Sequence, residues 1–170
     1  MIEFFAENVA MPQLDFNKIE KWIEEVSARH NYIVGNLTYC FCDDPYILDT
    51  NRKFLNHDYY TDIITFDYTR KFDDEEIISD DKILLIEEGH KEDLHAKDAS
   101  LCKVKGRISG DMVISLDTVR TNAEALGVGY TKELLRVIIH GVLHLCGIND
   151  KGPGEREIME AEENKALLLL

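Results

Sequence analysis

The sequence predicts an α+β fold, in which a small mixed β-sheet is packed with about five helices. Three observations predict it. Segments with the apolar period of helices alternate with short β-branched segments that are typical of strands. No internal repeat and no Pro-, Gly- or Ser-rich linker interrupts the chain. Its 170 residues suit one domain with its own core, so we expect a single domain over residues 1–170.

Two helices and two strands are expected in the first part of the chain. Asp15 can cap a helix that runs to about Arg29, and residues 37–41 alternate as a half-buried strand does. A proline opens a second helix over residues 45–56. One side of this helix would carry Ile47, Leu48, Asn51 and Leu55. Residues 62–66 are short and β-branched, which predicts the next strand.

Residues 67–108 are the least regular part of the sequence, and we interpret them as an acidic insertion. Between Asp73 and Asp98 there are 11 acidic residues and 3 lysines, a net charge of −8. We expect an inserted hairpin or a mobile loop here. The whole chain carries −14, which argues against indiscriminate nucleic-acid binding through bulk electrostatics. The remaining chain is only mildly acidic, so a local basic surface is compatible with this balance.

The last part of the chain predicts one buried strand and three helices. Residues 112–115 form the strand, and residues 117–126 form a helix that a glycine ends. The next helix begins at Thr131 and is apolar nearly all round, so it belongs in the middle of the domain. Gly147 ends it, and a last helix runs from about Gly154 to the leucine-rich end.

The sequence also indicates the cellular compartment in which the protein is expected. No apolar run approaches the roughly 20 residues that a membrane helix needs. The N-terminal residues lack the basic and apolar regions of a signal peptide. The four cysteines fit neither a zinc ribbon nor a CxxC motif, and reduced packing thiols are expected. We therefore expect a cytoplasmic protein with no membrane partner.

A candidate metal site lies on the central apolar helix. His140 and His144 are one turn apart on the same face, so both imidazoles can reach one ion. Gly147 lets the chain reverse, and Asp150 follows three residues later. Three protein ligands with one position open for water is the arrangement of a catalytic zinc site. The sequence therefore predicts a zincin-like helix and one divalent ion, with zinc favoured, on His140, His144 and Asp150.

The chemistry of such a site is hydrolysis. A bound zinc ion lowers the pKa of its water to about 7. The frame HxxxHxxGxxD equals that of the metzincin peptidases, but their general base follows the first histidine, and here that residue is Gly141. The substrate is then something other than a peptide, or the base comes from elsewhere. The alternative is two satisfied core histidines, although an unpartnered buried ring costs about 1–3 kcal/mol.

Several motifs together resemble the YbeY-type endoribonucleases, the rRNA maturation factor family. The run HGVLHLCG over residues 140–147 resembles the family signature HGxLHLxGYDH. Asn51 and residues 58–66 resemble LN…D-x-P-T-[DN]-V-L-S-F, and residues 110–115 resemble the GDIxIS strand. Residues 159–161 are similar to the C-terminal helix of the family. The resemblance covers most of the chain except about 67–108.

This resemblance implies a small α+β domain with one zinc that cleaves single-stranded RNA. In the family this activity serves 16S rRNA 3′-end maturation and ribosome quality control. The implied partners are rRNA and the small ribosomal subunit, and no DNA partner is expected.

Two positions depart from the family pattern. The third ligand is usually the histidine that ends GYDH, and Asp150 stands there, so the ion is zinc or a harder metal. The arginine of the LNxxYR stretch, which serves catalysis or phosphate contact, is replaced by Leu55. The candidate replacements are Arg52, Lys53, His57 and Lys151.

Two of these candidate sets have ordinary alternatives. His57 could be an acid–base partner because imidazole groups exchange protons near neutral pH, or it could be an exposed helix-end histidine. Lys103, Lys105 and Arg107 alternate, so on a strand they would face one way and could follow an RNA backbone. The alternative is a solvated strand face that balances the acidic insertion.

Three functions remain open at this point. The first is the metal-dependent endoribonuclease acting on rRNA. The second is a ribosome-assembly binding factor whose metal is mainly structural, which the loss of the arginine at Leu55 favours. The third is a metzincin-like metallopeptidase, against which Gly141 argues.

Overall fold

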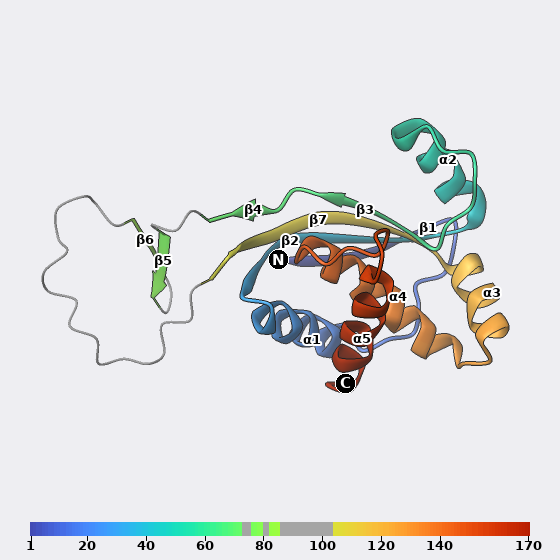
Figure 1. Ribbon diagram of the computed structural model, residues 1–170. Helices are drawn as coiled ribbons and strands as arrows, with labels where there is room; N and C mark the ends of the chain where they lie inside the picture. Colours follow the sequence, from blue (N-terminus) through green and yellow to red (C-terminus); the bar gives the residue numbers. More distant parts are fainter. Residues whose placement is uncertain (73–75, 80–81, 86–103) are drawn as a thin grey trace, which may run out of the picture.

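One mixed β-sheet organises the protein in the computed structural model, which describes residues 1–72, 76–79, 82–85 and 104–170 (Figure 1). Neighbouring strands follow the order β1-β2-β7-β3, and the short β4 also pairs with β7. The first three strands of this order are parallel, whereas β3 and β4 run antiparallel to β7. The strands are β1 (Ile2–Glu7), β2 (Tyr32–Cys42), β3 (Ile63–Asp67), β4 (Arg70–Lys71) and β7 (Gly106–Ser115).

In the part of the chain that the structure describes, five helices pack around this sheet, so the predicted α+β class with about five helices is confirmed. In Figure 1, α1, α4 and α5 lie on one side of the sheet and α2 lies on the other. Among the described residues, no helix has the length and apolar character needed to cross a membrane. The helices are α1 (Phe16–Arg29), α2 (Asp44–Leu55), α3 (Leu116–Leu126), α4 (Tyr130–Leu145) and α5 (Glu155–Leu167).

The core follows from the alternation of side chains along β7. Met112 and Ile114 are fully buried in the larger core cluster, together with most of α4. Val113 points the other way and packs against a smaller cluster that includes Ile47 of α2. The prediction that the apolar helix lies in the middle is confirmed, because nine of its residues are buried. This burial fixes the direction in which α4 presents its two histidines.

Local signals account for the helix boundaries. The Asp15 side chain accepts a hydrogen bond from the backbone N–H of Lys18, as expected of an N-cap. Asp43 caps α2 in the same way. The α2 helix ends one residue earlier than expected, and Asn56 adopts a left-handed conformation there. Leu55, which was expected on the same side of this helix as Ile47 and Asn51, lies at the helix end and is 41% exposed.

The sheet is larger than the sequence indicates. Strand β1 was not expected, because its alternation is short and its side chains are at most half-buried. Strands β2 and β7 extend well beyond 37–41 and 112–115, since they pair with each other along most of their length. Glycine permits the tight packing beside this sheet: a Cβ at Gly110 would lie 2.5 Å from the backbone oxygen of Phe66.

Part of the predicted insertion belongs to regular structure. Residue 67, β4 and residues 106–108 lie in the main sheet. Strands β5 (Glu76–Ser79) and β6 (Lys82–Leu85) pair with each other as a separate antiparallel sheet, as in the hairpin expected here. Residues 86–103, which carry much of the acidic run, lie outside the described residues.

Candidate metal centre

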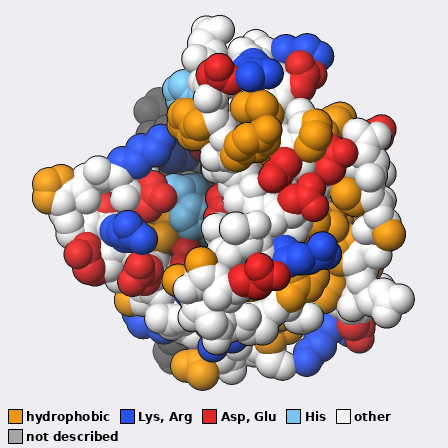
Figure 2. All heavy atoms as spheres, turned by 90° about the vertical axis from the view of Figure 1, so that its right-hand side faces the viewer, with side chains coloured by type: hydrophobic (Ala, Val, Ile, Leu, Met, Phe, Trp, Pro, Cys, Tyr) orange, Lys and Arg blue, Asp and Glu red, His pale blue; other side chains and the backbone are white. Residues whose placement is uncertain are grey.

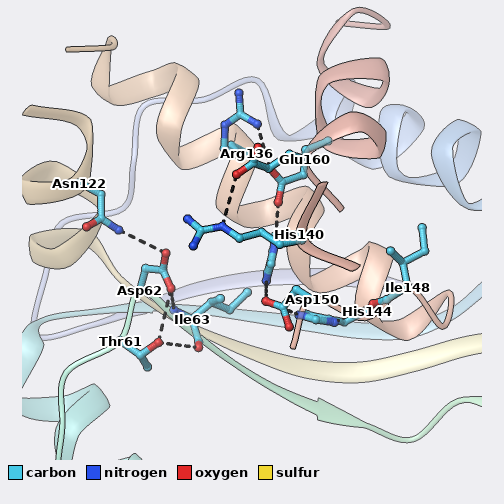
Figure 3. A network of polar contacts seen from close by, with 12 residues as sticks. Thr61, Asp62, Ile63, Asn122, Arg136, His140, His144, Ile148, Asp150 and Glu160 are labelled. Carbon is cyan, nitrogen blue, oxygen red and sulfur yellow. Dashed lines mark hydrogen bonds and ion pairs between the residues drawn. The ribbon is translucent and has the colours of Figure 1, made fainter. Parts of the chain in front are cut away.

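Three side chains converge at the C-terminal end of α4. The Nε2 atoms of His140 and His144 lie 3.7 Å and 3.8 Å from Oδ2 of Asp150. Figure 3 shows the carboxylate of Asp150 directed at both rings. One potential ligand atom from each residue lies within 4.8 Å of the others. The sequence predicted this convergence, and these three residues could hold a metal ion.

The backbone that follows α4 places Asp150 beside the histidines. Gly147 has φ +86°, a conformation that glycine adopts at low cost and that reverses the chain. The N–H groups of Gly147 and Ile148 then donate to carbonyls of the last helical turn, those of His144 and Leu143. The helix is thereby closed, and the chain returns past its own end. The HxxGxxD motif is the sequence pattern that corresponds to this turn.

Each histidine is oriented through its second ring nitrogen. Nδ1 of His144 lies 2.9 Å from the carbonyl oxygen of Ile148, to which it can donate. Nδ1 of His140 lies 2.7 Å from Oε1 of Glu163 on α5. Both contacts leave Nε2 as the atom that faces Asp150. A histidine held by a carbonyl or carboxylate on one nitrogen, with the other nitrogen available, is the usual arrangement of a metal ligand.

Glu163 and Arg136 form a second layer behind His140. The other oxygen of Glu163 accepts a hydrogen bond of 2.8 Å from Arg136, which also donates to the side chain of Asn164. Glu163 is 5% exposed, so this pairing compensates a buried charge. Sequence reasoning missed both residues. The one signal in the sequence was that Glu163 follows the 159–161 segment that resembles the family. The contacts of Glu163 with Arg136 and His140 form only when α5 packs on α4.

The pKa values of the cluster reflect these contacts. Burial alone would lower the pKa of His140, but the hydrogen bond and charge of Glu163, with Asp62 and Asp150, outweigh it and raise the pKa. Burial and the neighbouring His140 lower the pKa of His144, which favours its neutral form. Burial would raise the pKa of Glu163, but His140 and Arg136 lower it. Glu163 is therefore held as a carboxylate, which makes His140 a more basic ligand.

The geometry fits a divalent ion bound by two nitrogens and one oxygen. Bonds of about 2.0–2.2 Å in a tetrahedral site put ligand atoms roughly 3.3–3.5 Å apart, close to the observed 3.7 Å and 3.8 Å. These separations are too long for direct hydrogen bonds between the rings and Asp150. The three atoms thus converge without bonding one another. This donor set suits zinc and also harder ions.

A cavity of about 710 Å³ opens beside the cluster and includes His140 and Asp150 in its wall. Figure 2 shows histidine side chains at the bottom of a hollow on this face. Asp62, just before β3, also lines the cavity and lies close enough to raise the pKa of His140. Its carboxylate accepts hydrogen bonds from the N–H of Ile63 and from Asn122. The cavity can therefore take a substrate group next to the three candidate ligands.

Three of the four candidate replacements for the family arginine do not line this cavity. Arg52 forms an ion pair of 2.6 Å with Asp58, and Lys53 forms one of 2.6 Å with Asp49. His57 is exposed, and its Nδ1 lies 3.0 Å from the hydroxyl of Tyr59. None of these three basic residues is among the described residues that line the cavity. Their roles stay predictions.

The remaining basic candidates are spread over two places. Lys151 follows Asp150 and is exposed. Arg107 lies in β7 opposite Arg70, and Lys105 is exposed just before that strand. Lys103 lies outside the described residues. The structure therefore places Lys105 and Arg107 at the far end of β7 and does not bring them to the cavity wall.

Comparison with known proteins identifies the family. The family described as "Endoribonuclease YbeY" matches residues 4–170. A protein of Phocaeicola vulgatus with that name is 50% identical over 170 residues, covering 100% of this chain and 99% of its own. A namesake from Parabacteroides distasonis is 47% identical over 169 residues, covering 99% and 95%.

A solved structure supports the fold alone. The solution structure of TM1509 from Thermotoga maritima has a TM-score of 0.56 and 20% identity, and the match covers 98% of this chain and 87% of that one. The sequence matches carry the conclusion about the family: this chain belongs to the endoribonuclease YbeY family and is a hydrolase of the nuclease class.

Proposed function

We propose that this protein is a metal-dependent, single-strand-specific endoribonuclease that acts in 16S rRNA 3′-end maturation and ribosome quality control. The observation that carries the proposal is the convergence of His140, His144 and Asp150 beside a cavity, in a member of the YbeY family. The ion we propose is zinc, the partner is the small ribosomal subunit, and the compartment is the cytoplasm.

The residues of the site would have different roles in phosphodiester cleavage. A divalent ion held there would supply a Lewis acid for the phosphate and a source of nucleophilic water at neutral pH. His140 and His144 would bind it through Nε2, with Glu163 fixing the ring of His140. Because Gly141 cannot accept a proton, the base must come from another element. Asp62 is the candidate, since it lines the cavity from the side of β3.

The test is cleavage of RNA that carries the 3′ end of 16S rRNA, as a single strand and annealed to its complement. Purified protein with zinc should cut the single strand, and a chelator should stop the reaction until metal is returned. The ends of the products identify the attacking group, because a 2′,3′-cyclic phosphate excludes direct attack by water in the first step. A metal-loaded protein that cuts neither RNA would overturn the proposal.

A further inference from the structure

Three aromatic side chains are exposed on α2 and on the connection from α2 to β3. Phe54 in the last turn of α2 is 68% exposed, and Tyr59 and Tyr60 in the connection to β3 are 56% and 58% exposed. Figure 2 shows hydrophobic side chains gathered beside the hollow that holds the histidines. Tyr59 and Tyr60 are neighbours in the chain, and contiguous exposed apolar groups mark interaction sites whereas single ones do not.

The backbone that carries the two tyrosines is firmly held. Asn51 is 1% exposed, and its amide donates a hydrogen bond of 2.9 Å to the carbonyl oxygen of Tyr59. The backbone oxygen of Asn51 accepts from the N–H of His57 at 3.2 Å. The ion pair between Arg52 and Asp58 ties the same segment to α2. The buried asparagine thus fixes a loop whose own side chains stay in solvent.

Two of the rings are also oriented by their neighbours. Phe54 lies edge-on to Phe66 of β3, with ring centroids 5.6 Å apart. Tyr59 stacks on His57 at 5.2 Å, and its hydroxyl lies 3.0 Å from the ring nitrogen of His57. Rings that are already positioned lose little conformational entropy when a flat ligand binds to them.

The loop leads directly into the candidate site. Tyr60 precedes Asp62 by two residues, so their Cα atoms are at most about 7 Å apart. Asp62 lines the cavity that also contains His140 and Asp150. An RNA strand that is bound at the metal centre and leaves the cavity past Asp62 therefore passes the loop that carries Tyr59 and Tyr60.

We propose that Tyr59 and Tyr60 form a stacking platform for unpaired bases of the RNA strand that flanks the scissile phosphate. This inference rests on the proposed function. Single-strand binding proteins use aromatic rings in this way, because every base has a flat π-face. A base in a duplex is already stacked, so the platform selects single strands.

The experiment measures binding and cleavage of a fluorescein-labelled 12-nucleotide RNA, as a single strand and as a duplex. Tyr60→Leu and the pair Tyr59→Leu with Tyr60→Leu remove rings but keep apolar side chains. Tyr60→Phe keeps the ring and removes the hydroxyl. The matched control is Phe5→Leu, an aromatic residue that is 45% exposed on β1, at the opposite edge of the sheet from β3.

Binding is read by fluorescence anisotropy in chelator, and cleavage is read with zinc present. We expect Tyr60→Leu to weaken single-strand binding roughly 5- to 50-fold and to raise KM with kcat little changed. Tyr60→Phe and Phe5→Leu should stay within about twofold of wild type. Duplex binding should not depend on the tyrosines.

The outcomes separate this proposal from the proposed function. If wild type cuts RNA and both tyrosine variants bind the single strand as tightly as wild type does, the platform is excluded and the nuclease assignment stands. If wild type cuts no RNA but its single-strand binding depends on Tyr60, the platform stands and the nuclease assignment fails. Unchanged RNA binding together with lost self-association of the variants would assign the surface to a protein contact and exclude the platform.

Discussion

His144→Ala is expected to lower the rate of RNA cleavage by at least about 10³-fold, because the site loses one of its three metal ligands. The fold should survive. The ring of His144 is 28% exposed, and alanine is a good helix former at the end of α4. The measurement is single-turnover cleavage at saturating protein, beside a thermal melt of both proteins in chelator.

His30→Ala is the matched control. His30 lies at the end of α1 and pairs with Glu162 at 3.5 Å, so it should leave cleavage within about twofold of wild type. This pair of variants also addresses the alternative of a binding factor with a structural metal. In that case His144→Ala would unfold the protein, and the wild type would not cut RNA. A folded His144→Ala variant that cleaves RNA at the wild-type rate would contradict our account of the site.

Glu163→Ala is expected to have the largest effect on stability. It leaves the guanidinium of Arg136 without its 2.8 Å partner in a region where the carboxylate was 5% exposed. Breaking a buried ion pair from one side costs about 3–5 kcal/mol, and we expect the lower end because the side chain of Arg136 is 23% exposed. Urea denaturation of the metal-free proteins measures this loss.

The same variant should weaken metal binding about 10- to 100-fold, since the ring of His140 loses the carboxylate that orients it. Competition with a chromophoric chelator gives that affinity. Glu157→Ala, at an exposed position on the same helix, is the control and should change neither quantity. If Glu163→Ala binds metal as tightly as Glu157→Ala does, the second layer has no role in the site.

The sequence predicted what local patterns encode. The HxxxH spacing and the following glycine were enough to locate His140, His144 and Asp150, because helix geometry and the turn after α4 decide where they point. The apolar composition of α4 likewise predicted its burial. Capping by Asp15 and the helix class of each segment follow from interactions within a few residues.

The residues that sequence analysis missed depend on contacts between distant segments. Glu163 lies 23 positions after His140 in the chain and contacts it only because α5 packs on α4. Asp62 enters the cavity because β3 lies at the sheet edge beside β7. Strand β1 is held by pairing with β2 rather than by its own pattern. The Asn51 amide donates to the backbone oxygen of Tyr59, a contact that the periodic pattern of α2 does not reveal.

The most direct test of the central claim is elemental analysis of the purified wild-type protein beside Asp150→Ala, after both have been equilibrated with buffered zinc. We predict one metal ion per wild-type chain. The variant should bind zinc roughly 10²- to 10³-fold more weakly, because one of three ligands is gone. Equal metal content in the two proteins at limiting free zinc, or no metal in the wild type at any zinc concentration, would contradict a centre built from His140, His144 and Asp150.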